Sequence, residues 1–86
     1  MRALKNSRLN KRYRTLAYRR QGGCCYWCGV AMIVKTKKNG SWAWNHPCLC
    51  TADHLVLRAM GGVTVPENIV AACWSCNSRR HESANN

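Results

Sequence analysis

The sequence has very few acidic residues and no long apolar run. Three of its 86 residues are Asp or Glu against 14 Lys and Arg, so the formal net charge is +11. A surface this positive is suited to a polyanionic partner. The apolar runs, such as residues 30–34, are far too short to cross a bilayer. The cations are also not paired with a broad apolar helical face, so we expect no association with a membrane.

The sequence also lacks an N-terminal apolar segment of the kind that directs secretion, because residues 1–9 are basic and polar. We therefore expect a cytoplasmic, intracellular protein. In that compartment an odd number of cysteines, here seven, favours thiolate-bound metal over disulfides. A chain of 86 residues, which we expect to form one domain, buries too little apolar surface for a wide margin of stability. A metal cross-link is therefore expected.

The beginning of the chain predicts a basic helix. Apolar side chains recur there at the helical spacing: Leu9, Tyr13, Leu16 and Ala17. This stripe predicts a helix from about residue 10 to residue 20, ended by the two glycines that follow. Several cations point away from the stripe, and we expect three of them to contact phosphates: Arg12, Arg19 and Arg20. The alternative is a solvated helix face or a disordered basic arm within residues 1–23.

The middle of the chain predicts a β-ribbon. Residues 30–34 and 41–44 are compatible with strands, and Asn39-Gly40 between them suits a type I′ hairpin turn. Trp42 and Trp44 would share one face of the ribbon. Packing is favoured for that pair over stacking on a nucleic-acid base.

The second half predicts two further strands and a helix. The strands are expected over residues 49–57 and 68–72, with Gly61-Gly62 in the loop between them. A short helix is expected just beyond Cys76, followed by a frayed tail at residues 83–86.

Two Cys-x-x-Cys pairs predict a metal site: Cys25 with Cys28, and Cys73 with Cys76. Four thiolates complete a tetrahedral shell, which is typical of structural zinc and leaves no position for water or substrate. The binding energy of such a zinc would largely be the folding energy of the domain. Competing ligand sets draw on four other residues: Cys24, Cys48, Cys50 and His46. We interpret these three cysteines as small buried hydrophobic residues.

A second group of polar residues lies between and just beyond these pairs: Asp53, His54, Asn68, Asn77 and His81. Taken singly, each has a simpler explanation, such as a local ion pair, a turn or a helix cap. Their joint order, with Gly61-Gly62 and both Cys-x-x-Cys pairs, resembles the HNH (ββα-metal, or His-Me finger) endonucleases. The resemblance is to the branch in which two such cysteine pairs bracket the catalytic hairpin and helix. The chain departs from the name-giving pattern at Asn77, as in the HNN variants.

The resemblance implies a role for each of these polar residues. Asp53 and Asn77 would hold one catalytic divalent cation, Mg²⁺ or Mn²⁺. His81 lies one helical turn further on the same face, where the alternatives are a third ligand, a phosphate contact or an exposed helix residue. If it binds the ion, Ni²⁺ or Zn²⁺ becomes competitive. His54 would be the general base that takes a proton from the attacking water. Asn68 would accept a hydrogen bond from the other ring nitrogen of that histidine.

The resemblance also implies a fold and a partner. The fold would be α+β, with the N-terminal basic helix, the β-ribbon, and a zinc-bracketed ββα-metal core over residues 24–82. The partner would be duplex DNA, cut to leave a 5′-phosphate and a 3′-hydroxyl. Arg58, Arg79 and Arg80 flank the expected site and would contact the phosphates, which positions the duplex without reading bases.

The biological role implied by the resemblance is broad. Small proteins of this family are encoded by phages and mobile elements, where they serve genome packaging or element spread, and restriction is another family role. No recognition domain fits in 86 residues, so we expect weak sequence specificity, or specificity supplied by a partner protein or an oligomer. The alternative function is a non-catalytic zinc-stapled nucleic-acid-binding module, which would bind DNA whether or not His54 is present.

Overall fold

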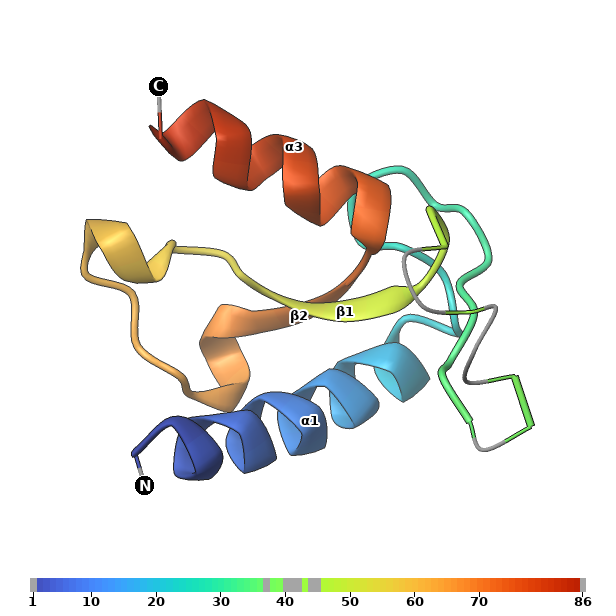
Figure 1. Ribbon diagram of the computed structural model, residues 1–86, viewed down its shortest axis with the longest axis horizontal. Coiled ribbons are helices and arrows are strands. Elements are labelled where there is room, and N and C mark those ends of the chain that lie inside the picture. Colours follow the sequence, from blue (N-terminus) through green and yellow to red (C-terminus); the bar gives the residue numbers. More distant parts are fainter. Residues whose placement is uncertain (1, 37, 40–42, 44–45, 86) are drawn as a thin grey trace.

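Two helices lie on either side of a two-stranded antiparallel sheet (Figure 1). The structure, a computed structural model, describes residues 2–36, 38–39, 43 and 46–85. The elements follow in this order: α1 (Arg2–Arg20), β1 (Cys50–His54), 3-10 turns at Arg58–Met60 and Pro66–Asn68, β2 (Ile69–Cys73) and α3 (Trp74–Asn85). The expected α+β class is confirmed, and the succession β1, β2, α3 is that of the expected ββα core.

The register of the sheet places the two expected sites at opposite ends of one antiparallel pair. Cys50 pairs with Cys73 at one end, and His54 pairs with Ile69 at the other. β2 is buried along its whole length, because α1 and α3 both pack against it. Cys73 leads directly into α3, so the second Cys-x-x-Cys pair spans the junction of β2 and α3.

Helix α1 begins earlier than expected, and one residue of the predicted apolar stripe, Leu16, does not face inward. It starts at Arg2 rather than near residue 10, since no glycine or proline precedes that point to stop a helix. Ala17 is fully buried, because its small side chain lets the helix approach β2 closely, whereas Leu16 is 46% exposed. No helix in the described part of the chain has both the length and the apolar composition that crossing a membrane requires.

Polar contacts tie the C-terminal end of α1 to β2. The side chain of Gln21 donates to the carbonyl of Ala71 at 2.8 Å and accepts from the N–H of the same residue at 3.0 Å. The amide thus pairs with the strand as a further backbone segment would. Arg20 adds a bond from its guanidinium to the carbonyl of Ile69 at 3.5 Å. The basic helix is therefore part of the folded unit and not a disordered arm.

The expected β-ribbon differs from what the described residues form. Single bridges link other partners: Cys24 with Ala31, and Ile33 with Leu49. The N–H of Ala43 donates to the carbonyl of Asn39 at 2.9 Å, which is the spacing of a helical turn and not of a two-residue hairpin turn. Part of the expectation falls on residues that lie outside the described ones: Gly40, Trp42 and Trp44.

Helix α3 extends beyond its expected bounds at both ends. It begins at Trp74, before Cys76 rather than after it, and its backbone continues to Asn85. The frayed tail expected from residue 83 is therefore helical up to that point. The segment contains no glycine or proline that would end the helix sooner.

The hydrophobic core is built from small side chains. Its buried members are mostly alanine and cysteine: Ala17, Cys25, Met32, Cys50, Ala71, Ala72, Cys73 and Cys76. Each of these alanines and cysteines buries less apolar area than a leucine or phenylalanine would, and the hydrophobic stabilisation scales with that area. Three of the four cysteines of the Cys-x-x-Cys pairs belong to this core, whereas Cys28 is exposed. The core and the expected zinc site are therefore the same part of the molecule.

Candidate active site and metal centre

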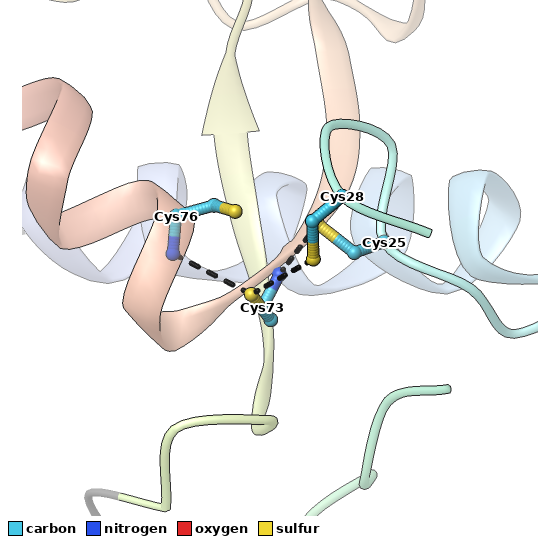
Figure 2. Close-up of side chains that lie close together, drawn as sticks. All are labelled: Cys25, Cys28, Cys73 and Cys76. Atoms are coloured by element: carbon cyan, nitrogen blue, oxygen red, sulfur yellow. Dashed lines mark hydrogen bonds between the residues drawn. The ribbon is translucent and has the colours of Figure 1, made fainter. Parts of the chain in front are cut away.

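The two Cys-x-x-Cys pairs bring four sulfur atoms together, all within 4.8 Å of one another: Cys25, Cys28, Cys73 and Cys76. Figure 2 shows the first pair on the loop after α1 and the second pair across the start of α3. The sulfurs of Cys28 and Cys73 are 3.9 Å apart. A tetrahedral zinc with Zn–S distances of about 2.3 Å separates its sulfurs by roughly 3.8 Å. The geometry and the soft donor set fit a structural metal such as zinc.

Hydrogen bonds from backbone N–H groups favour the thiolate form of Cys25. The sulfur of Cys25 accepts from the N–H of Trp27 at 3.4 Å and of Cys73 at 3.3 Å. Burial alone would raise the pKa of Cys25, but these two N–H groups and that of Cys28 lower the pKa to about 6. The chain turns sharply just after this pair at Gly29, whose φ of 79° is one that glycine adopts without strain.

The pKa values of the second pair, Cys73 and Cys76, are raised, which favours their protonated form. Burial raises the pKa of Cys73 to about 12, although its sulfur accepts from the N–H of Cys76 at 3.4 Å. Burial likewise raises the pKa of Cys76, whose sulfur accepts a bond from the guanidinium of Arg79 at 3.5 Å. Ionisation of Cys73 and Cys76 is therefore favoured by a cation bound among the sulfurs. Arg79, expected at DNA phosphates, lies against this cluster.

The competing zinc ligand sets are not assembled. Among the described residues, the four cysteines above are the one group of three or more His, Cys, Asp or Glu side chains close enough to share an ion. Cys50 is buried as expected, whereas Cys24 and Cys48 are only partly buried.

Asp53 is a fully buried carboxylate near the end of β1 with one satisfied and one unsatisfied oxygen. Its Oδ2 accepts a bond from the indole N–H of Trp27 at 2.8 Å and another from the guanidinium of Arg80. Its Oδ1 is buried and has no hydrogen-bond partner. A buried oxygen without a partner costs free energy, so such an atom marks a position where a ligand is expected.

Asn77, on the first turns of α3, has the same asymmetry. Its Nδ2 donates to the hydroxyl of Thr51 at 2.9 Å and to the carbonyl of Ala52 at 3.1 Å. Its Oδ1 is buried and has no partner. The amide lies against the peptide that joins Ala52 to Asp53, so the unpaired oxygens of Asp53 and Asn77 belong to neighbouring elements. Oxygen donors of this kind suit Mg²⁺ or Mn²⁺, and these residues fit such an ion.

His54 ends β1 with 8% of its surface exposed. One ring nitrogen, Nε2, lies 2.9 Å from the hydroxyl of Thr64. Burial lowers the pKa of the imidazole below its usual value of 6.5, and the nearby charge of Arg58 lowers it further against the opposing effect of Asp53. The ring is therefore neutral at physiological pH, which is the form that a general base requires.

Asn68 does not form the hydrogen bond with His54 that we expected. Its Oδ1 accepts from the N–H of Val56 at 2.8 Å, and its Nδ2 donates to the carbonyls of Val56 and Val63 at 3.1 and 2.9 Å. One side chain thus fixes the backbone just after His54 and just before Thr64. Asn68 therefore contacts the loop between His54 and Thr64 and not the imidazole itself.

The same loop is tightened by Gly62. A Cβ at this position would lie 1.7 Å from the carbonyl oxygen of Val56, so no other residue fits without moving the backbone. The glycine pair in the sequence therefore serves the close approach that Asn68 then holds.

Arg80 was expected at DNA phosphates, but the structure places it inside the site. Besides Asp53, its guanidinium donates to the carbonyls of His54 at 3.3 Å and Leu55 at 3.2 Å. It also stacks 4.3 Å from the centre of the Trp27 ring. Its side chain is 25% exposed. Arg80 therefore holds the end of β1 against α3.

The other two expected site residues lie at the surface. Arg58 is exposed in the loop after β1, and His81 is exposed on α3, one turn beyond Asn77. Both charges reach His54, whose pKa each of them lowers.

Two residues of the site were missed from the sequence: Trp27 and Thr64. Each meets its partner through the tertiary fold, Trp27 from 26 residues away and Thr64 from 10 residues away. The position of Trp27 between two metal-binding cysteines was a usable signal. Thr64 is an ordinary hydroxyl in a loop and carried none.

The fold and the site together define a small ββα domain, in which a two-stranded sheet and the helix after it converge on Asp53, His54 and Asn77. The family model of the HNH endonucleases matches residues 37–83, which is more than half of the chain. The chain therefore belongs to the HNH endonuclease family. Comparisons with curated proteins and with solved structures gave no match. The matched region includes the second cysteine pair, whereas α1 and the first pair precede it.

Proposed function

We propose that the protein is a metal-dependent DNA endonuclease or nickase with low sequence specificity. Membership of the HNH family indicates nuclease-type activity on nucleic acid. The observation that carries the proposal is the pair of buried oxygens without hydrogen-bond partners on Asp53 and Asn77, of which Asp53 directly precedes His54 in β1. A buried polar atom without a partner costs free energy unless a ligand binds to it.

Each side chain then has a defined task. Asp53 and Asn77 would hold the divalent cation through their free oxygens, with His81 as a third ligand. When bound, Mg²⁺ or Mn²⁺ supplies Lewis-acid stabilisation of the phosphoryl transition state. His54 would take the proton from the attacking water through the ring nitrogen that Thr64 does not occupy. Hydrolysis would leave a 5′-phosphate and a 3′-hydroxyl.

Exposed cations would hold the duplex. Arg58 and Arg79 are exposed near the site, and four cations of α1 line one shallow hollow on its surface: Arg8, Lys11, Arg12 and Arg19. α1 packs on the other face of the sheet from α3, so this hollow would contact phosphates remote from the scissile bond. Arg20, exposed at the end of α1, would also contact phosphates, while its guanidinium donates to the carbonyl of Ile69. Phosphate contacts carry no sequence information, hence the low specificity.

The wider setting follows from the same proposal. The chain would act as a single domain over residues 1–86 in a prokaryotic or phage context, as a packaging, mobile-element or restriction nuclease. A partner protein or an oligomer would supply any sequence specificity.

Plasmid nicking tests the proposal. Wild type with Mg²⁺ or Mn²⁺ should convert supercoiled plasmid to the open-circular form, and His54→Ala should lose this activity while it still binds DNA. His46→Ala is the matched histidine control outside the site and should cleave as wild type does. Zinc content is measured in every sample, so that loss of the structural zinc is not mistaken for loss of the catalytic ion. Equal cleavage by wild type and His54→Ala would reject His54 as the base.

A second candidate is the non-catalytic zinc-stapled nucleic-acid-binding module. One observation favours it: Arg80 forms an ion pair with the buried carboxylate of Asp53. It predicts salt-sensitive DNA binding that is indifferent to His54, and no metal-dependent nicking by wild type.

A further inference from the structure

We propose that Trp27 is a positioning residue for Asp53, and that it couples the cysteine cluster to the catalytic cation. The inference rests on the proposed function, because it assumes that Asp53 binds that cation. It concerns a residue that precedes the matched HNH region, on the loop that carries the first cysteine pair in Figure 2.

The two ends of Trp27 belong to different sites. Its backbone N–H donates to the sulfur of Cys25 at 3.4 Å, and its indole N–H donates to Oδ2 of Asp53 at 2.8 Å. The residue lies between the two sulfurs of the first pair, so the metal cross-link fixes its backbone. The same residue therefore links a cysteine sulfur directly to the buried carboxylate.

This contact determines which oxygen of Asp53 remains free. The indole and the guanidinium of Arg80 both bond Oδ2, which leaves Oδ1 as the unpaired atom. Trp27 also orients its co-donor, since Arg80 stacks 4.3 Å from the centre of the indole ring. Loss of the indole N–H would let the carboxylate rotate and Arg80 move. The free oxygen would then no longer be held for a cation.

A coupling between the two metal sites follows. Binding energies that are linked through one structural element are linked in both directions. Zinc at the cysteines fixes the loop that carries Trp27, and Trp27 in turn fixes Asp53. Zinc binding therefore raises the affinity for the catalytic cation.

The test is Trp27→Phe, which keeps an aromatic ring and removes the N–H donor. Trp74→Phe is the matched control, because Trp74 also lies within a Cys-x-x-Cys pair and is 41% exposed, close to the 43% of Trp27. Zinc content and the Mn²⁺ dissociation constant are measured without DNA. We expect one zinc per chain in both variants, about tenfold weaker Mn²⁺ binding in Trp27→Phe, and unchanged Mn²⁺ binding in Trp74→Phe.

Two outcomes would overturn the inference. The first is an Mn²⁺ affinity in Trp27→Phe equal to that of the wild type. The second is loss of zinc from this variant, because Trp27 would then support only the zinc site. Asp53→Ala separates this failure from that of the proposed function. Unchanged Mn²⁺ binding in Asp53→Ala would reject the proposed catalytic metal site itself. Weakened Mn²⁺ binding in Asp53→Ala, with no effect of Trp27→Phe, would reject only the coupling.

Discussion

The two ends of the same short sheet differ in how completely their polar atoms are satisfied. At the Cys50–Cys73 end, the sulfurs of Cys25 and Cys73 accept backbone N–H groups and lie in the core. Towards the His54–Ile69 end, Asp53 keeps a buried oxygen without a partner, and so does Asn77, whose amide lies against Thr51 and Ala52 in the same strand. The first end is arranged for stability. The second group carries buried polar atoms that a bound cation would complete, and under the coupling proposed above the first end would hold them in place.

The largest expected effect comes from removing one sulfur of the cysteine cluster. Cys25→Ser should abolish cooperative folding, because the core has few large apolar side chains and structural zinc supplies roughly 10 kcal/mol or more of folding energy. Cys24→Ser is the adjacent control and should retain zinc and the wild-type melting temperature, since Cys24 lies outside the cluster. Circular dichroism melts with zinc analysis check both variants. Equal melting temperatures for the two would show that the cysteine cluster does not support the fold.

The next effect disturbs the functional end without touching the metal ligands. Asn68→Ala removes three loop hydrogen bonds, so the backbone between His54 and Thr64 loosens. We expect kcat to fall roughly a hundredfold, as for a misplaced catalytic group, with a loss of about 1–3 kcal/mol in stability. Plasmid nicking and urea unfolding measure the two. A kcat close to wild type would mean that the loop does not position the base.

The lowered pKa of His54 predicts how the activity depends on pH. Burial, Arg58 and His81 hold the pKa of His54 below 6.5, so its neutral form persists as the pH falls through 6.5. The acidic limb of kcat/KM should therefore lie below pH 6.5, with activity falling about tenfold per pH unit beyond it. The unfolded chain binds this proton at higher pH than the folded chain does, so acid also reduces stability across the same window. Zinc content is followed in parallel, and a limb above pH 6.5 with zinc retained contradicts the assignment.

The smallest effects belong to cations remote from both ends. Arg12→Gln and Arg19→Gln should each weaken DNA binding a few-fold and reduce the salt slope by about one, leaving kcat unchanged. Binding titrations at several salt concentrations measure this. Unchanged slopes would indicate that the hollow on α1 is only a solvated surface.

The parts that the sequence predicted are those governed by short spacing. The Cys-x-x-Cys pairs, the glycine pair in the loop, and the order of two strands and a helix are local patterns, and the structure contains them. The inward face of α1 was largely predicted, because Ala17 of the expected stripe is fully buried, whereas Leu16 of the same stripe is exposed. The small side chain of Ala17 allows the closest approach to the sheet.

The partners inside the site were not predictable from spacing. Arg80 was expected to contact phosphate, but the fold places it against Asp53, 27 residues earlier in the chain. Asn68 was expected to contact the imidazole, but its amide matches the loop backbone instead. Such pairings depend on how α3 and the loop pack on β1, which no local pattern records.

Anomalous diffraction from crystals of His54→Ala with Mn²⁺ and DNA would show where each metal ion binds. We expect one manganese peak between Oδ1 of Asp53 and Oδ1 of Asn77, and a separate zinc peak at the four sulfurs. Manganese bound elsewhere, with Arg80 still the sole charge partner of Asp53, would contradict this expectation.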